Sequence, residues 1–488
     1  MHAARLNPQL DWKNLQVQVV RERLAWPPGD RPRRAGVSAF GMSGTNAHAL
    51  LEEAPPAPAV PSLPARPLEL VVLSARSAAA LAEAADRLAT SLAARPDVAL
   101  GDLAFSLATT RSSMECRLAL LTPSVDALRT ALTAVSRGET PAGAMRGEVK
   151  AEVTKRAWLF TGQGAQRAGM GKELYERWPV FRRAMDEVCG ELDRYLERPL
   201  REVMWAEEGS EEAKQLDQTV YTQAGMFALQ WALAQLWQSW GVRAERVVGH
   251  SIGELAAGCV AGVMTMKEGA RLVAARGRLM QALPVGGAMM TVGAGEREVA
   301  EELEGYQGRV VIAAVNAEDA VVIAGEKEEV REAGERLEKK GIRVKRLEVS
   351  HAFHSARMEP MMEEYRREAE RVEYGKKKIP MVSTVSGREA GEEVETAEYW
   401  VRQVREPVRF WEAAKTLKRE GVEEYLELGP RGVLVGLIRD SGGVEPVRLA
   451  SMRSGRGESE AMLEALGGYY VGGGEVEWKG VMGGEGKR

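Results

Sequence analysis

The sequence has few cysteines and no long apolar run. Its 488 residues include only three cysteines, Cys116, Cys189 and Cys259, which lie far apart and form no Cys-x-x-Cys pair. This spacing argues against a disulfide framework and a zinc site, and it fits a reducing cytoplasm. No apolar run reaches the ~20 residues of a membrane helix, and the N-terminus lacks the apolar core of a signal peptide. We therefore expect a cytoplasmic protein without a bound metal and without membrane contact.

The sequence also lacks an excess of charge of one sign. The formal net charge is -4, with 66 Lys and Arg against 70 Asp and Glu, which gives no reason to expect nucleic-acid binding. Hydrophobic residues make up 45% and charged residues 28%, as in ordinary globular proteins. A chain of this length predicts about three domains.

A proline-rich segment divides the chain near its start. Residues 54–67 read APPAPAVPSLPARP. Proline fixes φ and lacks a backbone donor, so this segment predicts a linker rather than a helix or strand. Residues 1–53 are too few for a sizeable core of their own, and we expect them to be part of a larger body.

Two α/β units follow the linker. The smaller has strand patterns at 68–75 and 117–123, each followed by an amphipathic helix, the first over 77–94 with Ser77 as N-cap, and it ends near residue 150. The larger begins with a strand that runs into a glycine turn at 156–166. The glycine-rich tail from Gly467 onward predicts a weakly ordered end.

Residues 288–349 have the order βαββαβ, which is the ferredoxin-like pattern. We expect a small subdomain, about 286–350, inserted into the larger unit. The predicted fold class is therefore α/β, with a large α/β-hydrolase-like subdomain that carries this insertion and a small α/β linker domain before it.

A serine motif suggests nucleophilic catalysis. The segment from Gly249 to Gly253, Gly-His-Ser-Ile-Gly, matches G-x-S-x-G at an expected strand-to-helix turn. Such a turn exposes the serine oxygen and directs a helix N-terminus at an anion formed there. A chance match in a glycine-rich chain is the alternative, but the context favours Ser251 as nucleophile.

The serine requires a base, and the chain has only five histidines. His250 adjoins the serine and should point away from it, His2 is at the terminus, and His48 lies beyond the linker. His351 and His354, in the segment SHAFHS, remain as candidates. A packed or surface histidine is the alternative for either.

An oxyanion requires donors, and a second glycine-rich loop offers them. Residues 160–166, FTGQGAQ, follow a predicted strand, and their glycines let the backbone approach a ligand closely. The loop lacks the Gly-Lys-Ser/Thr of a phosphate-binding P-loop, although an ordinary turn is the alternative.

Five motifs together resemble a known family. GQGAQ, GHSIGE, AARGRLMQ, VNAEDAVVIAG and SHAFHS resemble the acyltransferase domain of type I modular polyketide synthases and the related malonyl-CoA:acyl-carrier-protein transacylases. The resemblance covers roughly 153–440. Residues 54–152 resemble the ketosynthase-to-acyltransferase linker domain, and 441–488 resemble the linker that follows the acyltransferase.

Residues 31–55 resemble the C-terminal end of a ketosynthase, so 1–53 would be a ketosynthase remnant. His48 matches a histidine that helps to decarboxylate the extender unit in that family. No cysteine of this chain lies in a ketosynthase context, and we expect no condensing activity.

The resemblance assigns roles by position. Ser251 matches the acyl-accepting nucleophile, His354 the general base, and Arg276 the arginine that holds the extender carboxylate. The backbone amides of Gln163 and Ile252 match the oxyanion hole. In the family, a backbone carbonyl nearer the C-terminus orients the base.

The resemblance also implies a substrate. His351-Ala352-Phe353-His354 is similar to the motif of malonyl-specific domains, whereas methylmalonyl-specific domains usually carry Tyr-Ala-Ser-His. Phe353 would fill the space that an α-methyl branch needs, and Ile252 after the serine fits the malonyl pattern as well. Asn316 matches a position near the site.

The expected reaction moves malonyl from malonyl-CoA, through a Ser251 ester, to the phosphopantetheine thiol of an acyl carrier protein, in polyketide (antibiotic) synthesis. The chain itself would need no cofactor, and its other partner would be the rest of a synthase module. The alternatives are a serine hydrolase or thioesterase, a methylmalonyl-specific acyltransferase, and a non-enzymatic docking scaffold. A hydrolase normally places an acid between serine and histidine in the chain and gives no reason for Arg276.

Overall fold

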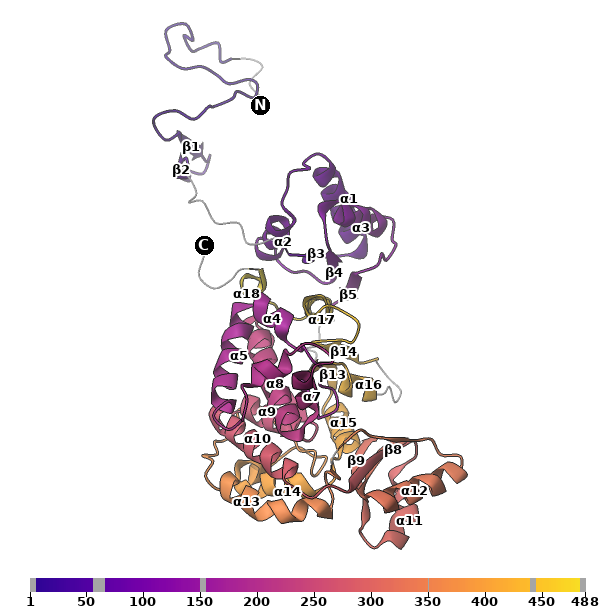
Figure 1. Cartoon of the computed structure of the whole chain (residues 1–488). Helices are drawn as coiled ribbons and strands as arrows, with labels where there is room; N and C mark the ends of the chain where they lie inside the picture. The colour runs from indigo at the N-terminus through magenta and orange to yellow at the C-terminus, as the bar shows by residue number, and fades with distance from the viewer. Residues whose placement is uncertain (1–5, 56–65, 150–154, 350, 439–444, 483–488) are drawn as a thin grey trace. The chain divides into compact units, whose positions relative to one another are not determined.

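The computed structural model describes residues 6–55, 66–149, 155–349, 351–438 and 445–482 (Figure 1). It divides into two units, residues 1–64 and 65–487. In the described part of the first unit, β1 (Arg34–Phe40) and β2 (Asn46–Glu52) form an antiparallel hairpin whose side chains are largely exposed. The predicted proline-rich linker falls mainly on residues 56–65, which lie outside the described residues.

A three-stranded antiparallel sheet opens the second unit, in the order β3-β4-β5. Its strands are β3 (Glu69–Ala75), β4 (Cys116–Thr122) and β5 (Ala144–Glu148), and its helices are α1 (Ala78–Ala93), α2 (Leu100–Thr109) and α3 (Val125–Ser136). Both strand patterns expected here are confirmed. So is the first helix, because Ser77 Oγ accepts from Ala80 N at 3.2 Å at its N-cap.

A five-stranded parallel sheet forms the centre of the largest part, in the order β12-β7-β6-β13-β14. Its strands are β6 (Lys155–Phe160), β7 (Arg246–Gly249), β12 (Met381–Val382), β13 (Val422–Leu428) and β14 (Val447–Ala450). The central strand β6 and its neighbour β7 begin with charged residues and are buried over the rest of their length, as expected where helices cover both faces.

Helices of this part include α4 (Lys172–Arg177), α5 (Pro179–Leu192), α6 (Leu200–Met204), α7 (Glu211–Lys214), α8 (Thr219–Ser239), α9 (Gly253–Ala261), α10 (Met266–Gln281), α13 (Glu359–Ala369), α14 (Ala397–Arg405), α15 (Phe410–Arg419) and α16 (Leu434–Leu437). The long helix α8 is buried on nearly all sides, and it therefore carries apolar residues around its whole circumference together with buried polar residues such as Gln223 and Gln230.

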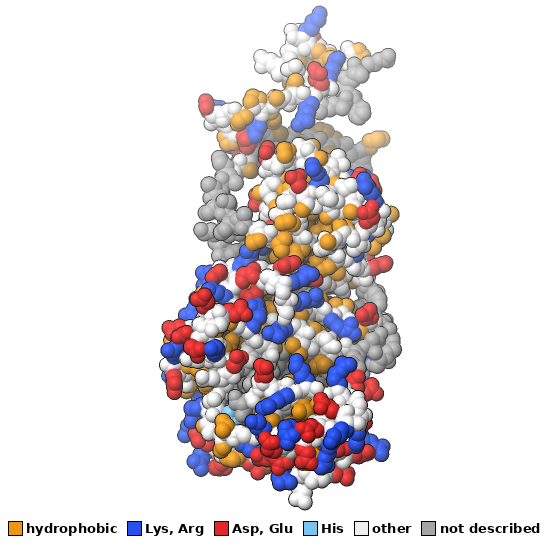
Figure 2. Space-filling view, turned by 45° about the vertical axis from the view of Figure 1, so that its right-hand side comes forward, with side chains coloured by type: hydrophobic (Ala, Val, Ile, Leu, Met, Phe, Trp, Pro, Cys, Tyr) orange, Lys and Arg blue, Asp and Glu red, His pale blue; other side chains and the backbone are white. Residues whose placement is uncertain are grey.

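The inserted subdomain is confirmed as βαββαβ, with the antiparallel sheet order β11-β8-β10-β9. Its elements are β8 (Gly287–Val292), α11 (Glu296–Leu303), β9 (Val310–Ala317), β10 (Ala320–Glu326), α12 (Lys327–Lys339) and β11 (Val344–Arg346). The outer faces of its helices carry paired charges such as Arg336 and Glu332, and Figure 2 shows acidic and basic side chains interspersed toward the lower end of the molecule.

The expectation of a weakly ordered tail from Gly467 is wrong for the described residues. The described residues there include the end of α17 (Glu458–Val471) and all of α18 (Trp478–Met482), and α17 packs against β4. A Cβ atom at Gly467 would lie 2.4 Å from Met145 Cε, so this glycine permits close packing rather than disorder. Residues 483–488 lie outside the described residues.

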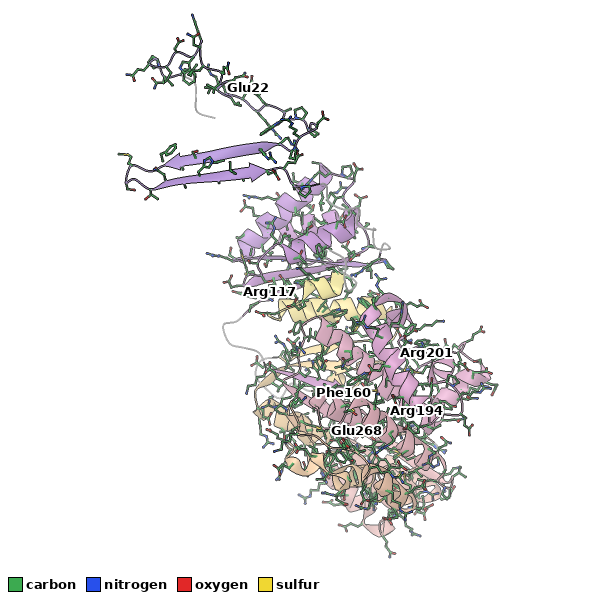
Figure 3. The ribbon with its side chains drawn as sticks, turned by 90° about the vertical axis from the view of Figure 1, so that its left-hand side faces the viewer. Glu22, Arg117, Phe160, Arg194, Arg201 and Glu268 are labelled. Carbon is green, nitrogen blue, oxygen red and sulfur yellow. The ribbon has the colours of Figure 1, made fainter. Side chains whose placement is uncertain are left out.

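Arg117 of β4 binds the end of α17 and the segment that follows it. Its Nη1 donates to the carbonyl oxygens of Tyr470 at 2.9 Å and Gly474 at 2.8 Å, and Figure 3 shows it beside the yellow C-terminal helix. Its guanidinium also lies over the Tyr470 ring, 4.8 Å from the centroid.

Within the described residues, no helix is both long and apolar enough to cross a membrane.

Candidate active site

Ser251 lies in a tight turn between β7 and α9, where the backbone leaves the ordinary conformations. Its φ is +51°, in the left-handed region that few L residues adopt. A Cβ atom at Gly249 would lie 2.3 Å from Glu254 Cα, and one at Gly253 would lie 2.2 Å from Phe160 O. The turn therefore requires both glycines of G-x-S-x-G, and it presents Ser251 at the carboxyl end of the parallel sheet.

His354 is the histidine that the structure brings to this serine. Ser251 Oγ lies 2.8 Å from His354 Nε2, and His354 Nδ1 lies 2.8 Å from the carbonyl oxygen of Glu406. Because a carbonyl only accepts, Nδ1 carries the proton and Nε2 is free to accept from the serine. Like Ser251, His354 has a positive φ, at 57°.

Burial sets the charge state of His354. It lowers the pKa from the ordinary 6.5 to about 3, with the positive charge of Arg276 as the second cause. The imidazole is therefore neutral at pH 7, which is the state that can accept a proton.

Arg276 of α10 places a buried cation beside the serine. Its Nη2 donates to Ser251 Oγ at 3.1 Å and its Nη1 to Gln223 Oε1 at 2.8 Å, while Nε has no partner within the described residues. Burial lowers its pKa to about 10, so the guanidinium keeps its charge at neutral pH. In the described ranges no carboxylate forms a salt bridge with it, and Glu254 acts on it only as a nearby negative charge that opposes the lowering of its pKa. A buried cation without a directly paired anion is costly. The arrangement is suited to binding an anionic group from outside.

The two predicted amide donors lie on segments that start at neighbouring strand ends. Phe160 at the end of β6 pairs with Gly249 at the end of β7, so the loop carrying Gln163 begins beside the serine turn. Gly162 packs against His250, where an added Cβ would lie 2.7 Å from Nδ1. In the described part of the chain, neither the Gln163 nor the Ile252 amide donates to a protein acceptor.

A cavity of about 310 Å³ opens over these groups. Ser251, His354, Arg276 and Gln163 all line it. Its apolar wall is formed by Met289, Ala313, Ala314, Val322, Leu347, Val349, Phe353, Val408, Leu434 and Leu437. Such a wall suits the uncharged part of an acyl thioester.

The predicted specificity residues do not all reach this cavity. Phe353 lines it, but His351 and Ala352 are not among its lining residues. His351 Nε2 instead lies 3.0 Å from Leu283 O, and Ala352 packs under Gly287 of β8. The Ile252 side chain is buried in the core beneath the turn.

His250 lies at the cavity edge but does not act on the serine. Its Nε2 lies 2.9 Å from Oδ1 of Asn316 on β9, and this bond joins the serine turn to the inserted subdomain. Burial lowers the His250 pKa, which keeps the imidazole neutral. His48, in the other unit, contacts Ser38 Oγ at 2.8 Å through Nδ1.

A buried network beneath the serine was not identified from the sequence. The Glu254 carboxylate is fully buried and accepts from Thr384 N, Thr384 Oγ1, Tyr399 OH and Gln403 Nε2 at 2.6–3.1 Å. Burial raises the Glu254 pKa. The residue belongs to the motif GHSIGE, but its partners lie more than 100 positions away and carry no local signal.

Within the described ranges, no group of three or more His, Cys, Asp or Glu side chains is arranged to hold a metal ion.

Comparisons with known proteins agree on one family. A family model described as acyl transferase domain matches residues 157–474, and one described as ketoacyl-synthetase C-terminal extension matches 7–120. The acyltransferase domain from the second module of the salinomycin polyketide synthase is 42% identical, with a TM-score of 0.71 over 84% of this chain and 95% of that one. An acyl carrier protein S-malonyltransferase from Vibrio cholerae is 31% identical, with a TM-score of 0.53 over 58% of this chain and 93% of that one.

The chain is 46% identical over 490 residues to polyketide synthase GfsA of Streptomyces halstedii, which covers 98% of this chain. The same alignment covers 6% of GfsA, so the chain spans a small part of that relative's length.

Proposed function

The chain belongs to the acyl transferase domain family, and from that premise we propose that it transfers malonyl from malonyl-CoA to an acyl carrier protein through an ester on Ser251. One observation carries the proposal: the 2.8 Å contact of Ser251 Oγ with His354 Nε2, made beside the unpaired guanidinium of Arg276. In this proposal Ser251 is the nucleophile, His354 the base and Arg276 the carboxylate-binding group, and all three side chains line one cavity.

In the first half-reaction, His354 Nε2 accepts the hydroxyl proton while Ser251 Oγ attacks the thioester carbonyl. The amides of Gln163 and Ile252 donate to the oxyanion; loss of one such donor typically costs about 2.7–4 kcal/mol. As the intermediate collapses, the carbon–sulfur bond breaks and His354 returns its proton to the departing thiolate. Free coenzyme A and a malonyl-serine ester remain.

The second half-reaction reverses these steps with a different thiol. The phosphopantetheine thiol of the carrier protein gives its proton to His354 and attacks the ester carbonyl. The carbon–oxygen bond to Ser251 then breaks, and His354 returns the proton to Ser251 Oγ. The same residues serve both half-reactions, which predicts ping-pong kinetics.

Arg276 selects acyl groups that end in a carboxylate. Its planar fork can form two parallel hydrogen bonds with such a group. An acetyl group would leave this buried cation unpaired, so the site discriminates against it.

Phe353 selects against a branch on the acyl chain. It lines the cavity that also holds Ser251 and His354, and its ring is far larger than the serine of methylmalonyl-specific domains. One methyl group in a pocket is worth about 1–3 kcal/mol, so we expect a preference of about 10- to 200-fold for malonyl-CoA over methylmalonyl-CoA.

The proposed partners follow from this chemistry. The donor is a coenzyme A thioester, the acceptor is the phosphopantetheine arm of a carrier protein, and the chain supplies no cofactor of its own. The names of the relatives support the proposal that the chain acts within a polyketide synthase module, and the Vibrio protein is named for malonyl transfer.

The test is intact-mass spectrometry of the chain after exposure to malonyl-, methylmalonyl- and acetyl-CoA, followed by addition of a carrier protein. We expect one malonyl adduct, absent from Ser251→Ala, that moves to the carrier protein. Release of free malonate faster than transfer would identify a hydrolase instead. If methylmalonyl-CoA loaded the protein as well as or better than malonyl-CoA, the proposed substrate would be wrong, but the proposed acyltransferase activity would stand.

A further inference from the structure

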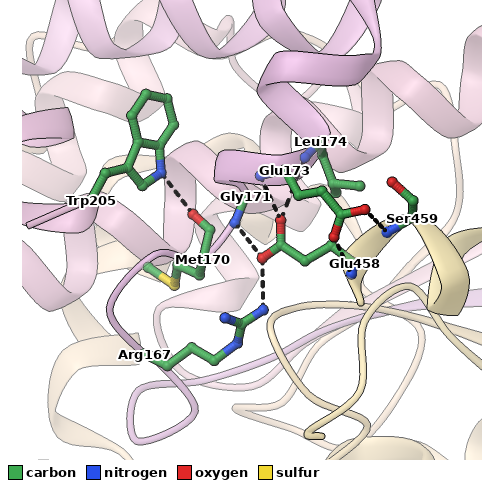
Figure 4. A network of polar contacts seen from close by, with 8 residues as sticks. All are labelled: Arg167, Met170, Gly171, Glu173, Leu174, Trp205, Glu458 and Ser459. Carbon is green, nitrogen blue, oxygen red and sulfur yellow. Dashed lines mark hydrogen bonds and ion pairs between the residues drawn. The ribbon is translucent and has the colours of Figure 1, made fainter. Parts of the chain in front are cut away.

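Two helices from opposite ends of the acyltransferase region cap each other (Figure 4). Glu458, the first residue of α17, accepts from the backbone amides of Gly171, Glu173 and Leu174 at 2.9–3.4 Å, at the start of α4. Glu173 returns the interaction by accepting from the amides of Glu458 at 2.7 Å and Ser459 at 3.2 Å. Each carboxylate thus satisfies amides that the other helix leaves without an intrahelical acceptor.

Glu458 also binds a side chain on the loop that carries Gln163. Arg167 Nη2 donates to Glu458 Oε1 at 2.6 Å. The Glu458 side chain is 6% exposed, so this ion pair is partly shielded from water. Arg167 is four positions from Gln163, and the Gly171 amide, bound by the same oxygen, ends the loop.

Other restraints also act on this part of the loop. Gln166 Nε2 donates to Asp217 Oδ1 at 3.2 Å, Gly169 N donates to Met204 O at 2.7 Å, and Trp205 Nε1 donates to Met170 O at 3.0 Å. All three contacts join the loop to residues that precede α8. Among the described residues, Glu458 adds the contacts that join the loop to the C-terminal segment.

The far end of α17 is fixed elsewhere. Gly467 packs against Met145 of β5, and Arg117 of β4 holds the carbonyl oxygens of Tyr470 and Gly474. The position of α17 is therefore determined by the three-stranded sheet as well as by α4.

We propose that Glu458 is a positioning residue for the reaction, holding the loop through Arg167 and the Gly171 amide so that the Gln163 amide faces the developing oxyanion. This inference rests on the proposed function, which gives Gln163 its role. A side chain more than 200 positions from Ser251, outside the predicted acyltransferase boundaries, then contributes to the rate of acylation.

The test compares Glu458→Gln with Glu460→Gln in the full chain. The first variant keeps its size but loses its charge, and its amide NH₂ meets amides that also donate. Glu460, on the same helix, pairs with the exposed Arg456 and does not contact the loop, which makes it the matched control. Arg167→Gln is the second test, because it removes the ion pair between the loop and Glu458 and leaves the backbone amide contacts of the helix caps in place.

Three measurements are made on each variant: single-turnover acylation by malonyl-CoA, inactivation by a fluorophosphonate, and hydrogen exchange of residues 162–171. Displacement of catalytic groups by about 1 Å can lower rates about 100-fold. We expect Glu458→Gln to lower the maximal acylation rate about 10- to 100-fold with little change in the half-saturating concentration of malonyl-CoA. It should also slow inactivation by the fluorophosphonate, because the phosphoryl oxygen of that reagent needs the same amide donors. Hydrogen exchange of the loop should become faster. Arg167→Gln should have the same effects to a smaller extent, and Glu460→Gln should match the unmodified protein.

The inference is wrong if Glu458→Gln acylates at the unmodified rate, or if all its loss comes from a lower fraction of folded protein. Failure of the unmodified chain to form the malonyl adduct would instead reject the proposed function, while faster loop exchange in Glu458→Gln would still be observed.

Discussion

Gln403 donates from Nε2 to the carbonyl oxygen of Ser251 at 2.7 Å, and the same nitrogen contacts Glu254 Oε2 at 3.1 Å. The amide thus joins the nucleophile's own backbone to the buried carboxylate beneath it. One turn further along, the Glu406 carbonyl accepts from His354 Nδ1. The end of α14 therefore holds both members of the proposed catalytic pair.

Gln403→Leu should lower the maximal rate of acylation about tenfold or more, because the positive φ of Ser251 loses the donor that holds it and small displacements of a reacting atom are costly. It should also destabilise the fold by about 1–3 kcal/mol, since Glu254 loses a buried donor. Stopped-flow acylation and denaturant unfolding measure the two effects. Arg402→Leu, at an exposed position of the same helix, should change neither.

His354→Ala should reduce transfer to the carrier protein by at least about 100-fold, as expected for loss of a general base. His351→Ala should retain far more activity, because that side chain contacts Leu283 O and does not line the cavity. Steady-state transfer assays on both variants measure this difference. Equal losses of activity in the two variants, or a larger loss in His351→Ala, would show that His354 is not the base.

Arg276→Ala should lower kcat/KM for malonyl-CoA by about 100-fold or more, since it leaves a buried carboxylate unpaired. Acetyl-CoA has no carboxylate and should be affected much less. Competition between the two thioesters, measured by the mass of the acyl-enzyme, gives the ratio directly. An unchanged preference would show that Arg276 does not bind the acyl group.

The pH dependence should reflect the lowered pKa of His354. The base acts when neutral, so a folded-state pKa of about 3 keeps it active as the pH falls through 6.5, the ordinary value. Inactivation by a fluorophosphonate, which carries no carboxylate of its own, should therefore stay level between about pH 8 and pH 5. Arg276→Met removes the second cause of the shift and should move the acidic limb upward. A half-loss of rate near pH 6.5 in the unmodified protein would contradict this account.

Phe353→Ser should relax the preference for malonyl-CoA over methylmalonyl-CoA, by no more than the value of one methyl group, about 1–3 kcal/mol. Adding His351→Tyr should contribute little, because His351 does not line the cavity. Mass spectrometry of Ser251 with both thioesters present measures each step. A larger effect from His351→Tyr alone would indicate that specificity depends on the segment's backbone rather than on the cavity wall.

Local patterns were sufficient to predict much of this fold. The βαββαβ insertion was predicted because its strands and helices each have clear periodicity over a short range. The tail from Gly467 was predicted wrongly because glycine has two uses, and only the position of Met145 reveals that close packing applies here.

The candidate site, like the fold, contains some residues that the sequence could identify and others that it could not. Ser251 lies in a motif whose glycines are sterically required, so sequence could identify it. The carbonyl of Glu406 and the amide of Gln163 could not be derived from residue type, because every residue offers such groups. The contacts of Glu458 and Gln403 join residues that are 100 or more positions apart, and a single sequence does not record such contacts.

The placement of α17 bears on where this acyltransferase domain can be joined to other protein segments. The helix covers apolar residues of the three-stranded sheet, including Ala119 of β4, while its first residue caps α4. If a chimaera were joined near residue 440, after the last of the proposed catalytic residues, the loop with Arg167 would come from one protein and α17 from the other. The transplantable piece therefore extends to Met482 and includes the three-stranded sheet, so that the contacts at both ends of the helix move together.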